Sequence, residues 1–329
     1  MTIAFTVCSN NFLAQAKTLS GSLLYHNPGI KHFIFLADEK KVSVDYNFFA
    51  PAEIIVVNEN IVPGFQELVG KYSLIELNSD LKPFLFEYLV EKYPQATRLL
   101  YLDSDVCVYD RLDHLDAVMK DSDIVITPHF CTPLPDDGLE PFENIALNFG
   151  TYNLGFLAIN PQTSNTRRFL KWWSDRTRKF GFQDAGNGYF VDQLWFNLVP
   201  VFFEKVHTLK HPGYNMAPWN LHERIIAHKS DDGKIMLQSG ETLVFYHFSS
   251  YDYFRPELIS WKYNRYNFTN LTGLRKLYDD YRLSLAKNNI GEFSKIKCGL
   301  AVKMKPQPGP VKRLLYPGVN LLRKIWKKM

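Results

Sequence analysis

The chain has 329 residues, of which 46% are hydrophobic, and it carries 38 lysines and arginines against 34 aspartates and glutamates. This length supports one large domain or two smaller ones. The four cysteines are scattered without a C-x-x-C pair, which argues against a disulfide framework or a cysteine zinc site and favours a reducing, cytoplasmic compartment. No apolar run in the sequence approaches the roughly 20 residues that cross a bilayer.

The formal net charge of +4 is distributed unevenly along the chain. Residues 293–329 contain ten lysines and arginines and no acid, so residues 1–292 hold 28 basic against 34 acidic residues, a net charge of about −6. Because the basic character belongs to this tail, no nucleic-acid partner is expected for the main part of the chain. We therefore predict a domain at 1–292 and a basic linker and tail at 293–329.

The tail combines a proline-rich linker with a short amphipathic pattern. Prolines at 306, 308, 310 and 317 disfavour a helix there. Apolar residues then recur at helical spacing among basic ones, at Val319, Leu322 and Trp326. A basic amphipathic helix of this kind can lie on an anionic bilayer, which would make the protein peripheral on the inner face of the plasma membrane. The alternatives are a solvated tail and a helix docked on its own domain.

Residues 1–128 alternate between apolar runs and helical segments. Strands are predicted at 2–8, 32–37, 53–57, 97–102 and 123–127, and helices at 11–25, 80–92 and 111–119. The residues from Met1 lack a charged region and a cleavage site, so we expect a first strand there and not a signal peptide. Ser79 or Asp80 is expected to cap the helix at 80–92, with Pro83 in its first turn. The alternation predicts a mostly parallel sheet with helices on both faces.

A segment with three prolines and several acids, at 131–150, interrupts this pattern. A loop of this length in a compact domain is usually functional or disordered, and we predict a mobile functional loop. Further elements are predicted as a strand at 152–159, helices at 163–180 and 189–198, and a strand at 242–248.

The most informative stretch is Leu99-Leu-Tyr-Leu-Asp-Ser-Asp105, in which four large apolar residues end in two carboxylates. Such a run is typical of a buried strand, and open α/β sheets bind ligands at the carboxyl ends of their strands. Asp103 and Asp105 are two positions apart, so they can face the same way, and a divalent cation would relieve their repulsion. The alternative is an ordinary turn at the end of a strand, since Asp and Ser are common in turns.

Five segments resemble those of family 8 glycosyltransferases and related bacterial surface-polysaccharide and lipooligosaccharide transferases, in the family's order. They are 5–12 with the helix that follows, 78–88 with 99–105, 153–160, 192–197 and 245–249. The segment 214–224 is also similar to one in the bacterial transferases. The resemblance covers about residues 3–255 and implies the glycosyltransferase A fold, an α/β protein with a mostly parallel mixed sheet flanked by helices, followed here by the helical basic tail. It divides the domain into a nucleotide-binding half at about 1–128 and an acceptor half at about 129–292.

The resemblance implies a metal site. In the family, the two carboxylates of the D-x-D motif bind Mn²⁺ or Mg²⁺ that bridges the diphosphate of the donor, which assigns this role to Asp103 and Asp105. The family's third ligand is a histidine near the end of the domain, which matches His247. The cation neutralises charge on the departing diphosphate, and an imidazole ligand suits Mn²⁺ better than Mg²⁺. Without the resemblance, a histidine at a strand end is more often a hydrogen-bonded structural residue.

The donor that the resemblance implies is a UDP-sugar. Thr6, Val7 and Cys8, at the end of the first strand, match the family's backbone contacts to the uracil and ribose. Phe12 lies where the family often has an aromatic residue that stacks on the base. Ser104, between the two carboxylates, belongs to the same donor site. Lys82 falls where the family places a basic residue against the phosphates, near a helix N-terminus that is itself an anion site. The alternatives are a core role for Phe12 and a solvated surface lysine at 82.

The resemblance also implies a site for the transferred sugar. Asn153, Asp192 and Gln193 correspond to residues that line the donor sugar near its anomeric carbon. Gln193 matches the family's candidate for stabilising an oxocarbenium-like centre, because an amide oxygen supports positive charge without being a strong nucleophile. Asp192 would hold a sugar hydroxyl or orient the acceptor, and the alternative for it is a helix N-cap.

One part of the family's pattern is altered. The family follows its histidine with a glycine and then Lys-Pro-Trp, whereas this chain has Ser250 in place of the glycine and no lysine in register. Arg255 could bind the phosphate from a shifted position, since a guanidinium binds phosphate bidentately. A candidate wall for the acceptor sugar, with a core tryptophan as its alternative, is formed by Trp219, Asn220, His222 and Glu223.

The sequence thus predicts a metal-dependent enzyme that moves a hexose from a UDP-sugar to a glycan or glycolipid in polysaccharide or lipopolysaccharide biosynthesis, with retention implied by the resemblance. Two alternatives stay open. A sugar nucleotidyltransferase would carry a glycine-rich basic phosphate loop after its first strand, and residues 8–12 contain neither glycine nor a basic residue. A glycan-binding or scaffold subunit with a decayed site is favoured by the altered residues at 250–255 and disfavoured by the intact metal motif.

Overall fold

The computed structural model describes residues 1–300, so the amphipathic segment and the proline linker predicted for the tail lie outside the described residues. The strands are β1 Thr2–Cys8, β2 Lys31–Leu36, β3 Glu53–Val56, β4 Arg98–Leu102, β5 Val106–Val108, β6 Ile124–Pro128, β7 Tyr152–Ile159, β8 Gln183–Asp184, β9 Tyr189–Phe190, β10 Val206–Thr208, β11 Ile226–Lys229, β12 Ile235–Leu237 and β13 Phe245–His247. The α-helices are α1 Leu13–His26, α2 Phe65–Lys71, α3 Leu74–Asp80, α4 Lys82–Lys92, α5 His114–Val118, α6 Asn144–Phe149, α7 Ser164–Phe180, α8 Val199–Phe202, α9 Gly273–Lys287 and α10 Ile290–Phe293. Short 3-10 helices lie at Asn10–Phe12 (η1), Tyr46–Phe49 (η2), Ala185–Asn187 (η3) and Leu194–Leu198 (η4).

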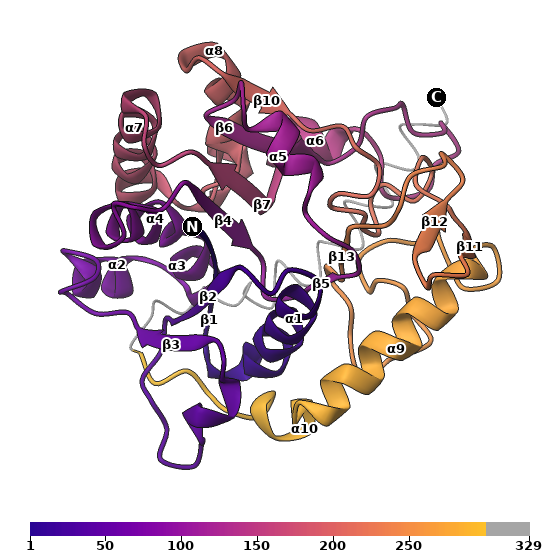
Figure 1. The fold of residues 1–329 in the computed structure, drawn as a ribbon, viewed down its shortest axis with the longest axis horizontal. Helices are drawn as coiled ribbons and strands as arrows, with labels where there is room; N and C mark the ends of the chain where they lie inside the picture. Colours follow the sequence, from indigo (N-terminus) through magenta and orange to yellow (C-terminus); the bar gives the residue numbers. More distant parts are fainter. Residues whose placement is uncertain (301–329) are drawn as a thin grey trace, which may run out of the picture.

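Seven strands of the described chain form the central sheet, in the order β10-β6-β7-β4-β1-β2-β3 (Figure 1). The pairs β1–β2, β1–β4, β2–β3 and β10–β6 are parallel, whereas β7 runs antiparallel to both β4 and β6. The carboxyl ends of β1 and β4 therefore lie at the same edge of the sheet as the amino end of β7. Three segments that carry predicted site residues meet at this edge.

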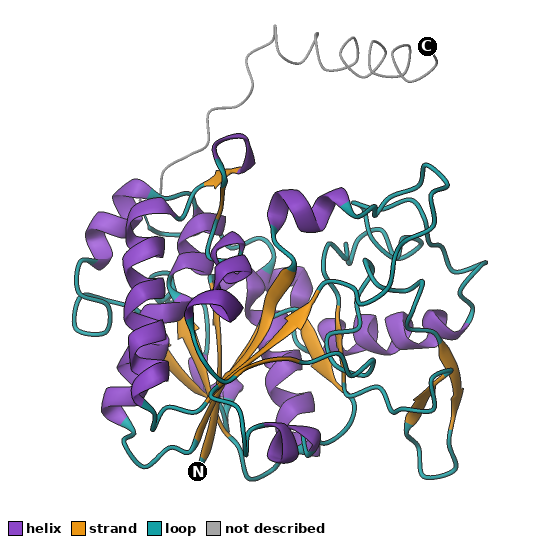
Figure 2. Ribbon diagram, turned by 90° about the horizontal axis from the view of Figure 1, so that it is seen from above, coloured by secondary structure: helices purple, strands orange, loops and turns teal. Residues whose placement is uncertain are grey.

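The strands alternate their side chains between two packed faces. On β1, Phe5 and Val7 join the core formed with α4 and α7, whereas Ala4 packs in the core formed with α1. Helices α4 and α7 lie side by side on one face, and α1 lies on the other, with α9 and α10 beyond it (Figure 1). Seen from above, the strands fan out between these groups of helices (Figure 2). The predicted mixed, mostly parallel sheet with helices on both faces is confirmed.

The strands and helices predicted for residues 1–128 are confirmed to within a few residues, as are the strand at 152–159 and the helix at 163–180. The helix predicted at 189–198 is wrong. The chain forms β9 and η4 there, because Gly188 and Val191 have φ of 78° and 42°, in the left-handed region that a right-handed helix cannot include. The strand predicted at 242–248 is shorter, and α6 forms within the predicted loop at 131–150.

Helix α3 precedes α4 and was not predicted. Ser73 begins α3 with a capping box, so Ser79 and Asp80 lie at the end of α3 and do not cap α4. The N-cap of α4 is Leu81, whose side chain makes no capping hydrogen bond, and Pro83 lies in the first turn as predicted. Within residues 1–300, no helix is both long and apolar enough to cross a membrane.

The start of the predicted tail packs on the domain. Phe293, the last residue of α10, lies with its ring centroid 5.9 Å from that of Phe49. The backbone N–H of Gly299 donates to Asp38 Oδ1 at 2.7 Å. Contacts with the domain thus extend from α10 to residue 299.

Candidate metal centre and active site

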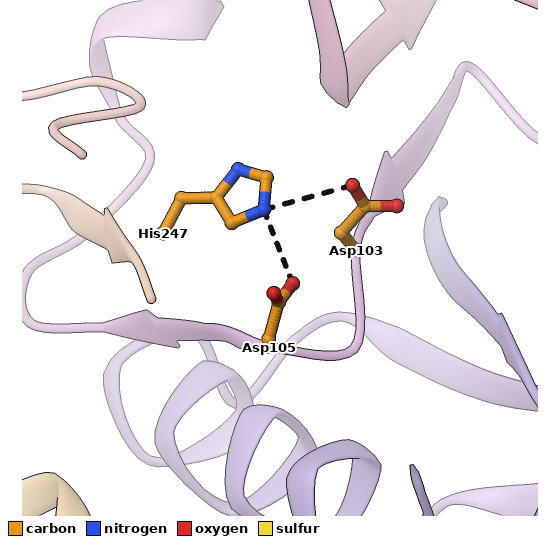
Figure 3. Close-up of side chains that lie close together, drawn as sticks. All are labelled: Asp103, Asp105 and His247. Carbon is orange, nitrogen blue, oxygen red and sulfur yellow. Dashed lines mark ion pairs between the residues drawn. The ribbon is translucent and has the colours of Figure 1, made fainter. Parts of the chain in front are cut away.

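Three side chains with metal-binding atoms meet at the carboxyl edge of β4 (Figure 3). Asp103 follows β4 directly, Asp105 precedes β5, and His247 ends β13. The antiparallel pairing of β13 with β5 sets His247 opposite Val106, and so beside Asp105. His247 Nε2 lies 3.1 Å from Asp105 Oδ1 and 3.7 Å from Asp103 Oδ2. One ligand atom from each of the three residues lies within 4.8 Å of the others.

Backbone hydrogen bonds hold the two carboxylates in place. The N–H of Asp103 donates to the carbonyl of Gly155 at 2.9 Å, and the N–H of Val106 donates to the carbonyl of Asp103 at 3.0 Å. The Tyr101 hydroxyl also donates to Asp103 Oδ1. Two carboxylate oxygens and one imidazole nitrogen fit Mn²⁺, whereas Mg²⁺ prefers oxygen ligands throughout.

Gly155 makes room for the imidazole. A Cβ atom at this position would lie 2.3 Å from His247 Cε1 and 2.5 Å from His247 Nδ1. Any side chain on residue 155 would therefore displace the ring from its place beside the carboxylates. The glycine of Asn153-Leu-Gly155 is thus required by the packing of a residue that lies 92 positions later in the sequence.

The charges in the cluster shift the pKa values of its members. Burial lowers the pKa of His247, but the carboxylates of Asp105 and Asp103 outweigh it, and the net pKa is raised. Burial raises the pKa of Asp105, but the neighbouring imidazole outweighs this effect and the net pKa is lowered. A divalent cation bound here would take the place of a proton on Nε2 between the two carboxylates.

Lys82 joins this cluster from the first turn of α4. It is only 5% exposed, which rules out the solvated lysine that the sequence left open. Its Nζ lies 3.0 Å from Asp192 Oδ2 and 3.8 Å from Asp103 Oδ1, and it donates to the carbonyl of Leu154 at 3.1 Å. Burial lowers the pKa of Lys82, but Asp192 and Asp103 outweigh it, so the net pKa is raised. Burial raises the pKa of Asp192 to about 6, although Lys82 opposes the shift.

A cavity of about 400 Å³ opens between β1, α3 and the two carboxylates. Its lining consists of Val7, Cys8, Ser9, Asn11, Phe12, Leu74, Ile75, Asn78, Ser79, Lys82, Tyr101, Asp103, Ser104 and Asp105. Phe12 is 42% exposed and Ile75 is 63% exposed, so both present apolar surface to a ligand instead of joining the core. The lining therefore combines apolar side chains, such as Phe12 and Ile75, with the carboxylates of Asp103 and Asp105 and the ammonium group of Lys82.

The amide side chains predicted for the sugar site are buried next to the metal ligands. Gln193 Oε1 accepts from the N–H of Leu154 at 3.2 Å and from Asn153 Nδ2 at 3.3 Å. Gln193 Nε2 donates to the carbonyl of Phe149 at 2.8 Å. Asp192 is not the N-cap of η4, a position held by Gln193, because its carboxylate turns to Lys82.

No protein-family model matches the chain. The uncharacterized protein YfnF of Bacillus subtilis (strain 168) is 28% identical over 266 residues, which are 76% of this chain and 82% of YfnF. The uncharacterized protein YfnD of the same bacterium is 22% identical over 248 residues, which are 75% of this chain and 76% of YfnD.

Solved structures resemble the chain more clearly in fold than in sequence. The galactosyltransferase LgtC, in complex with donor and acceptor sugar analogs, is similar with a TM-score of 0.52 and 17% identity, over 86% of this chain and 96% of LgtC. The bifunctional glycosyltransferase WbbM has a TM-score of 0.51 and 16% identity, over 90% of this chain and 51% of WbbM. The chain has the glycosyltransferase A fold. The fold class predicted from the sequence is therefore confirmed.

Two predicted donor residues lie away from the cavity of this glycosyltransferase A fold. Thr6 is fully buried and its Oγ1 has no hydrogen-bond partner in the structure. Arg255 pairs with Asp252 at 2.7 Å and does not line the cavity. Ser250, which replaces the family's glycine, has a φ of 60°, a left-handed conformation that favours glycine.

For the predicted acceptor wall the structure favours the alternative of a core tryptophan, and the other side chains of the wall also make contacts within the fold. Trp219 is 2% exposed and packs edge-on against His247, with ring centroids 5.1 Å apart. Asn220 Nδ2 donates to the carbonyl of His129 at 3.0 Å. The Glu223 carboxylate accepts from the backbone N–H groups of Cys131 and Thr132, and Thr132 Oγ1 lies 3.1 Å from His222 Nε2. These side chains tie the segment after β6 to the segment before β11.

Sequence reasoning missed three residues of this site. Asn215 contacts His247 through its side chain, and Tyr101 donates to Asp103. Asp80 is fully buried near Asp192 with neither carboxylate oxygen hydrogen-bonded, and burial raises its pKa well above the ordinary value. Asn215 lies in the segment 214–224 that resembles the bacterial transferases, and this was the one available signal for it.

Proposed function

We propose that the chain is a metal-dependent hexosyltransferase that moves a hexose from a UDP-sugar to a glycan or glycolipid acceptor in polysaccharide or lipopolysaccharide biosynthesis. Retention of the anomeric configuration is part of this proposal. The observation that carries it is the meeting of Asp103, Asp105 and His247, of which the two carboxylates line an open cavity. The similarity to LgtC and WbbM supports the fold on which the proposal rests.

The composition of the cavity supports a nucleoside diphosphate as its ligand. Pockets for small molecules commonly measure about 300–1,000 Å³ and join apolar walls to a few polar groups. Phe12 and Ile75 offer exposed apolar surface for a base, and Lys82 lines the same cavity with the two carboxylates. We assign the uracil to the Phe12 end and the diphosphate to Lys82 and the metal ligands.

The metal would act as a Lewis acid that stabilises the charge on the departing diphosphate. Asp103, Asp105 and His247 would hold it, and the imidazole makes Mn²⁺ the better candidate over Mg²⁺. Lys82 is already within 4 Å of Asp103, so it adds a fixed positive charge beside the same phosphates.

Asn153, Asp192 and Gln193 are assigned to the sugar. Their position beside Lys82 and the metal ligands supports this assignment, because the anomeric carbon must lie next to the diphosphate that leaves it. Asp192 would accept a hydrogen bond from a sugar hydroxyl, and the Gln193 amide would lie near the developing positive charge.

Isothermal titration with UDP, in Mn²⁺ and in EDTA, tests the metal dependence. We expect Asp105→Asn to abolish the Mn²⁺-dependent part of UDP binding. Asp121→Asn is the matched control, because Asp121 is exposed and lies outside the cavity. Equal UDP affinity with and without metal would refute the proposal. UDP binding with no UDP release from any UDP-sugar would point to a binding or scaffold subunit.

We also propose that the basic tail binds anionic membrane surfaces, on the strength of its sequence pattern alone. In flotation with liposomes that contain anionic lipid, the full chain should rise with the liposomes, and a chain that ends at residue 300 should stay in the bottom fraction. Equal flotation of the two chains would refute this role.

A further inference from the structure

The imidazole of His247 has a partner on each ring nitrogen. Nε2 faces Asp105 and Asp103, whereas Nδ1 lies 3.2 Å from Asn215 Oδ1. His247 and Asn215 are both buried, at 4% and 0% exposure. A buried imidazole in a metal site must present an unprotonated nitrogen to the metal, so the nature of the Nδ1 contact decides how the ring can bind.

The backbone of β7 fixes the orientation of the neighbouring amides. The N–H of Gly155 donates to Asn153 Oδ1 at 3.0 Å, and the N–H of Leu154 donates to Gln193 Oε1 at 3.2 Å. A backbone N–H can only donate, so each of these side-chain atoms must be an oxygen. The usual ambiguity between the oxygen and nitrogen of an amide is thereby removed for both residues.

These two orientations determine that of Asn215. Because Asn153 presents its oxygen to Asn215, the atom that approaches it must be the nitrogen, and Asn215 Nδ2 donates to Asn153 Oδ1 at 3.0 Å. The same Nδ2 group donates to Thr127 Oγ1 at 2.9 Å. The oxygen of Asn215 is therefore the atom that faces His247 Nδ1.

An oxygen acceptor at this place requires a proton on Nδ1. The lone pair of the neutral ring then lies on Nε2, the nitrogen that faces the two carboxylates. The ring lies close against Gly155 and in edge contact with Trp219. The backbone of β7 thus selects the tautomer of His247 through Asn153 and Asn215.

We propose that Asn215 is a positioning residue that holds His247 in the Nδ1–H tautomer and directs its Nε2 lone pair at the metal. The inference rests on the proposed function for the presence of the metal, and it deepens that function by naming the residue that prepares the ligand. The same chain of amides ends at Gln193, so one network orients the metal ligand and the amide assigned to the sugar.

The test measures binding of Mn²⁺ alone by isothermal titration, with nitrogen hyperfine coupling to bound Mn²⁺ as the spectroscopic readout. Asn215→Leu removes the acceptor at nearly constant volume, and we expect Mn²⁺ to bind about 10–100-fold more weakly, with loss of the histidine nitrogen coupling. Asn215→Asp loses the Nδ2 donor to Asn153 Oδ1 but keeps an oxygen toward Nδ1, so it should retain the histidine nitrogen coupling and bind Mn²⁺ more tightly than Asn215→Leu.

Thr127→Val is the matched control. It leaves the Nδ2 group of Asn215 short of one partner but keeps the contact to His247, so its Mn²⁺ affinity should match that of the wild-type chain. If Asn215→Leu does not fold, as judged by loss of cooperative unfolding, the comparison of Asn215→Asp with the wild type decides.

Unchanged Mn²⁺ affinity and coupling in folded Asn215→Leu would overturn the inference, as would a loss in Asn215→Asp as large as that expected for leucine. The proposed function fails separately, and the inference with it, if the wild-type chain itself does not bind Mn²⁺. Binding of Mn²⁺ by the wild type together with an unaffected leucine variant would overturn the role of Asn215 alone.

Discussion

Replacing Gly155 by alanine should disable the metal centre while leaving the fold intact. The added Cβ would lie 2.3 Å from His247 Cε1, 2.5 Å from His247 Nδ1 and 2.8 Å from Asn153 Oδ1. Ordinary contact begins at 3.4 Å, so the imidazole or the strand must shift by about 1 Å. The ring cannot easily move away, because the backbone of His247 is fixed. His247 is paired with β5 in β13, and its backbone N–H donates to the carbonyl of Met216 at 2.8 Å.

The expected size of the effect follows from this shift. Metal–ligand distances hold to within about 0.2 Å, so a displacement five times larger removes Nε2 from the coordination shell. We expect Mn²⁺ affinity to fall about 10–100-fold, which corresponds to about 1.4–2.7 kcal/mol. Overpacking of a buried site should lower the free energy of unfolding by about 1–3 kcal/mol.

Titration with Mn²⁺ and urea unfolding, on the same preparations, measure both quantities. Gly21→Ala is the matched control, because Gly21 lies within α1 and a Cβ there meets nothing within 4 Å. This control should keep full Mn²⁺ affinity and gain about 0.4–1 kcal/mol of stability. A folded Gly155→Ala chain that binds Mn²⁺ as tightly as the wild type would refute the proposed place of His247 in the metal site.

Three further predictions concern other residues. Lys82→Gln should lower the rate of UDP release from a UDP-sugar by more than about tenfold, because it removes a fixed charge near the phosphates; a rate within twofold of wild type would contradict the assignment. Phe12→Ala should weaken UDP binding by about 1–3 kcal/mol, because it removes the ring that stacks on the base. The free energy of unfolding should change little, since Phe12 is 42% exposed. Titration with UDP measures the loss, and wild-type UDP affinity in Phe12→Ala would contradict the stacking role. Burial lowers the pKa of His32 to about 3, so the unfolded chain binds the proton first as the pH falls below about 6.5, and stability is lost on acidification. Between pH 6.5 and 5 the loss in urea unfolding should be about 1.6 kcal/mol smaller in His32→Gln than in the wild type, because buried His129, whose pKa is lowered to about 4, contributes equally to both chains; equal slopes for the two chains would contradict it.

The sequence predicted the parts of the fold that local patterns determine. Strands such as β1 and β4 are predominantly apolar, and their burial on both faces of a central sheet follows from that composition. The segment at 189–198 carries apolar residues at positions that fit a helix, but the left-handed conformations of Gly188 and Val191 prevent a helix from forming there. Those torsion angles accompany the hairpin of β8 and β9, which the local sequence pattern did not predict.

The metal ligands could be predicted for a different reason. Asp103 and Asp105 are close in sequence, and His247 was supplied by the resemblance to a family. The contacts that orient them could not be predicted, because Asn215 reaches His247 across 32 positions and Lys82 reaches Asp192 across 110. Trp219 was expected to face a sugar and is buried, since its exposure depends on how the loop after β10 packs against β13.

Slow hydrolysis of a panel of UDP-sugars, with Mn²⁺ and with EDTA, tests the central claim most directly, because it needs no acceptor. We expect release of UDP from at least one UDP-hexose in Mn²⁺, with little or none in EDTA or in Asp105→Asn. Release that is unaffected by EDTA, or no release from any UDP-hexose by a chain that binds Mn²⁺ and UDP, would contradict it.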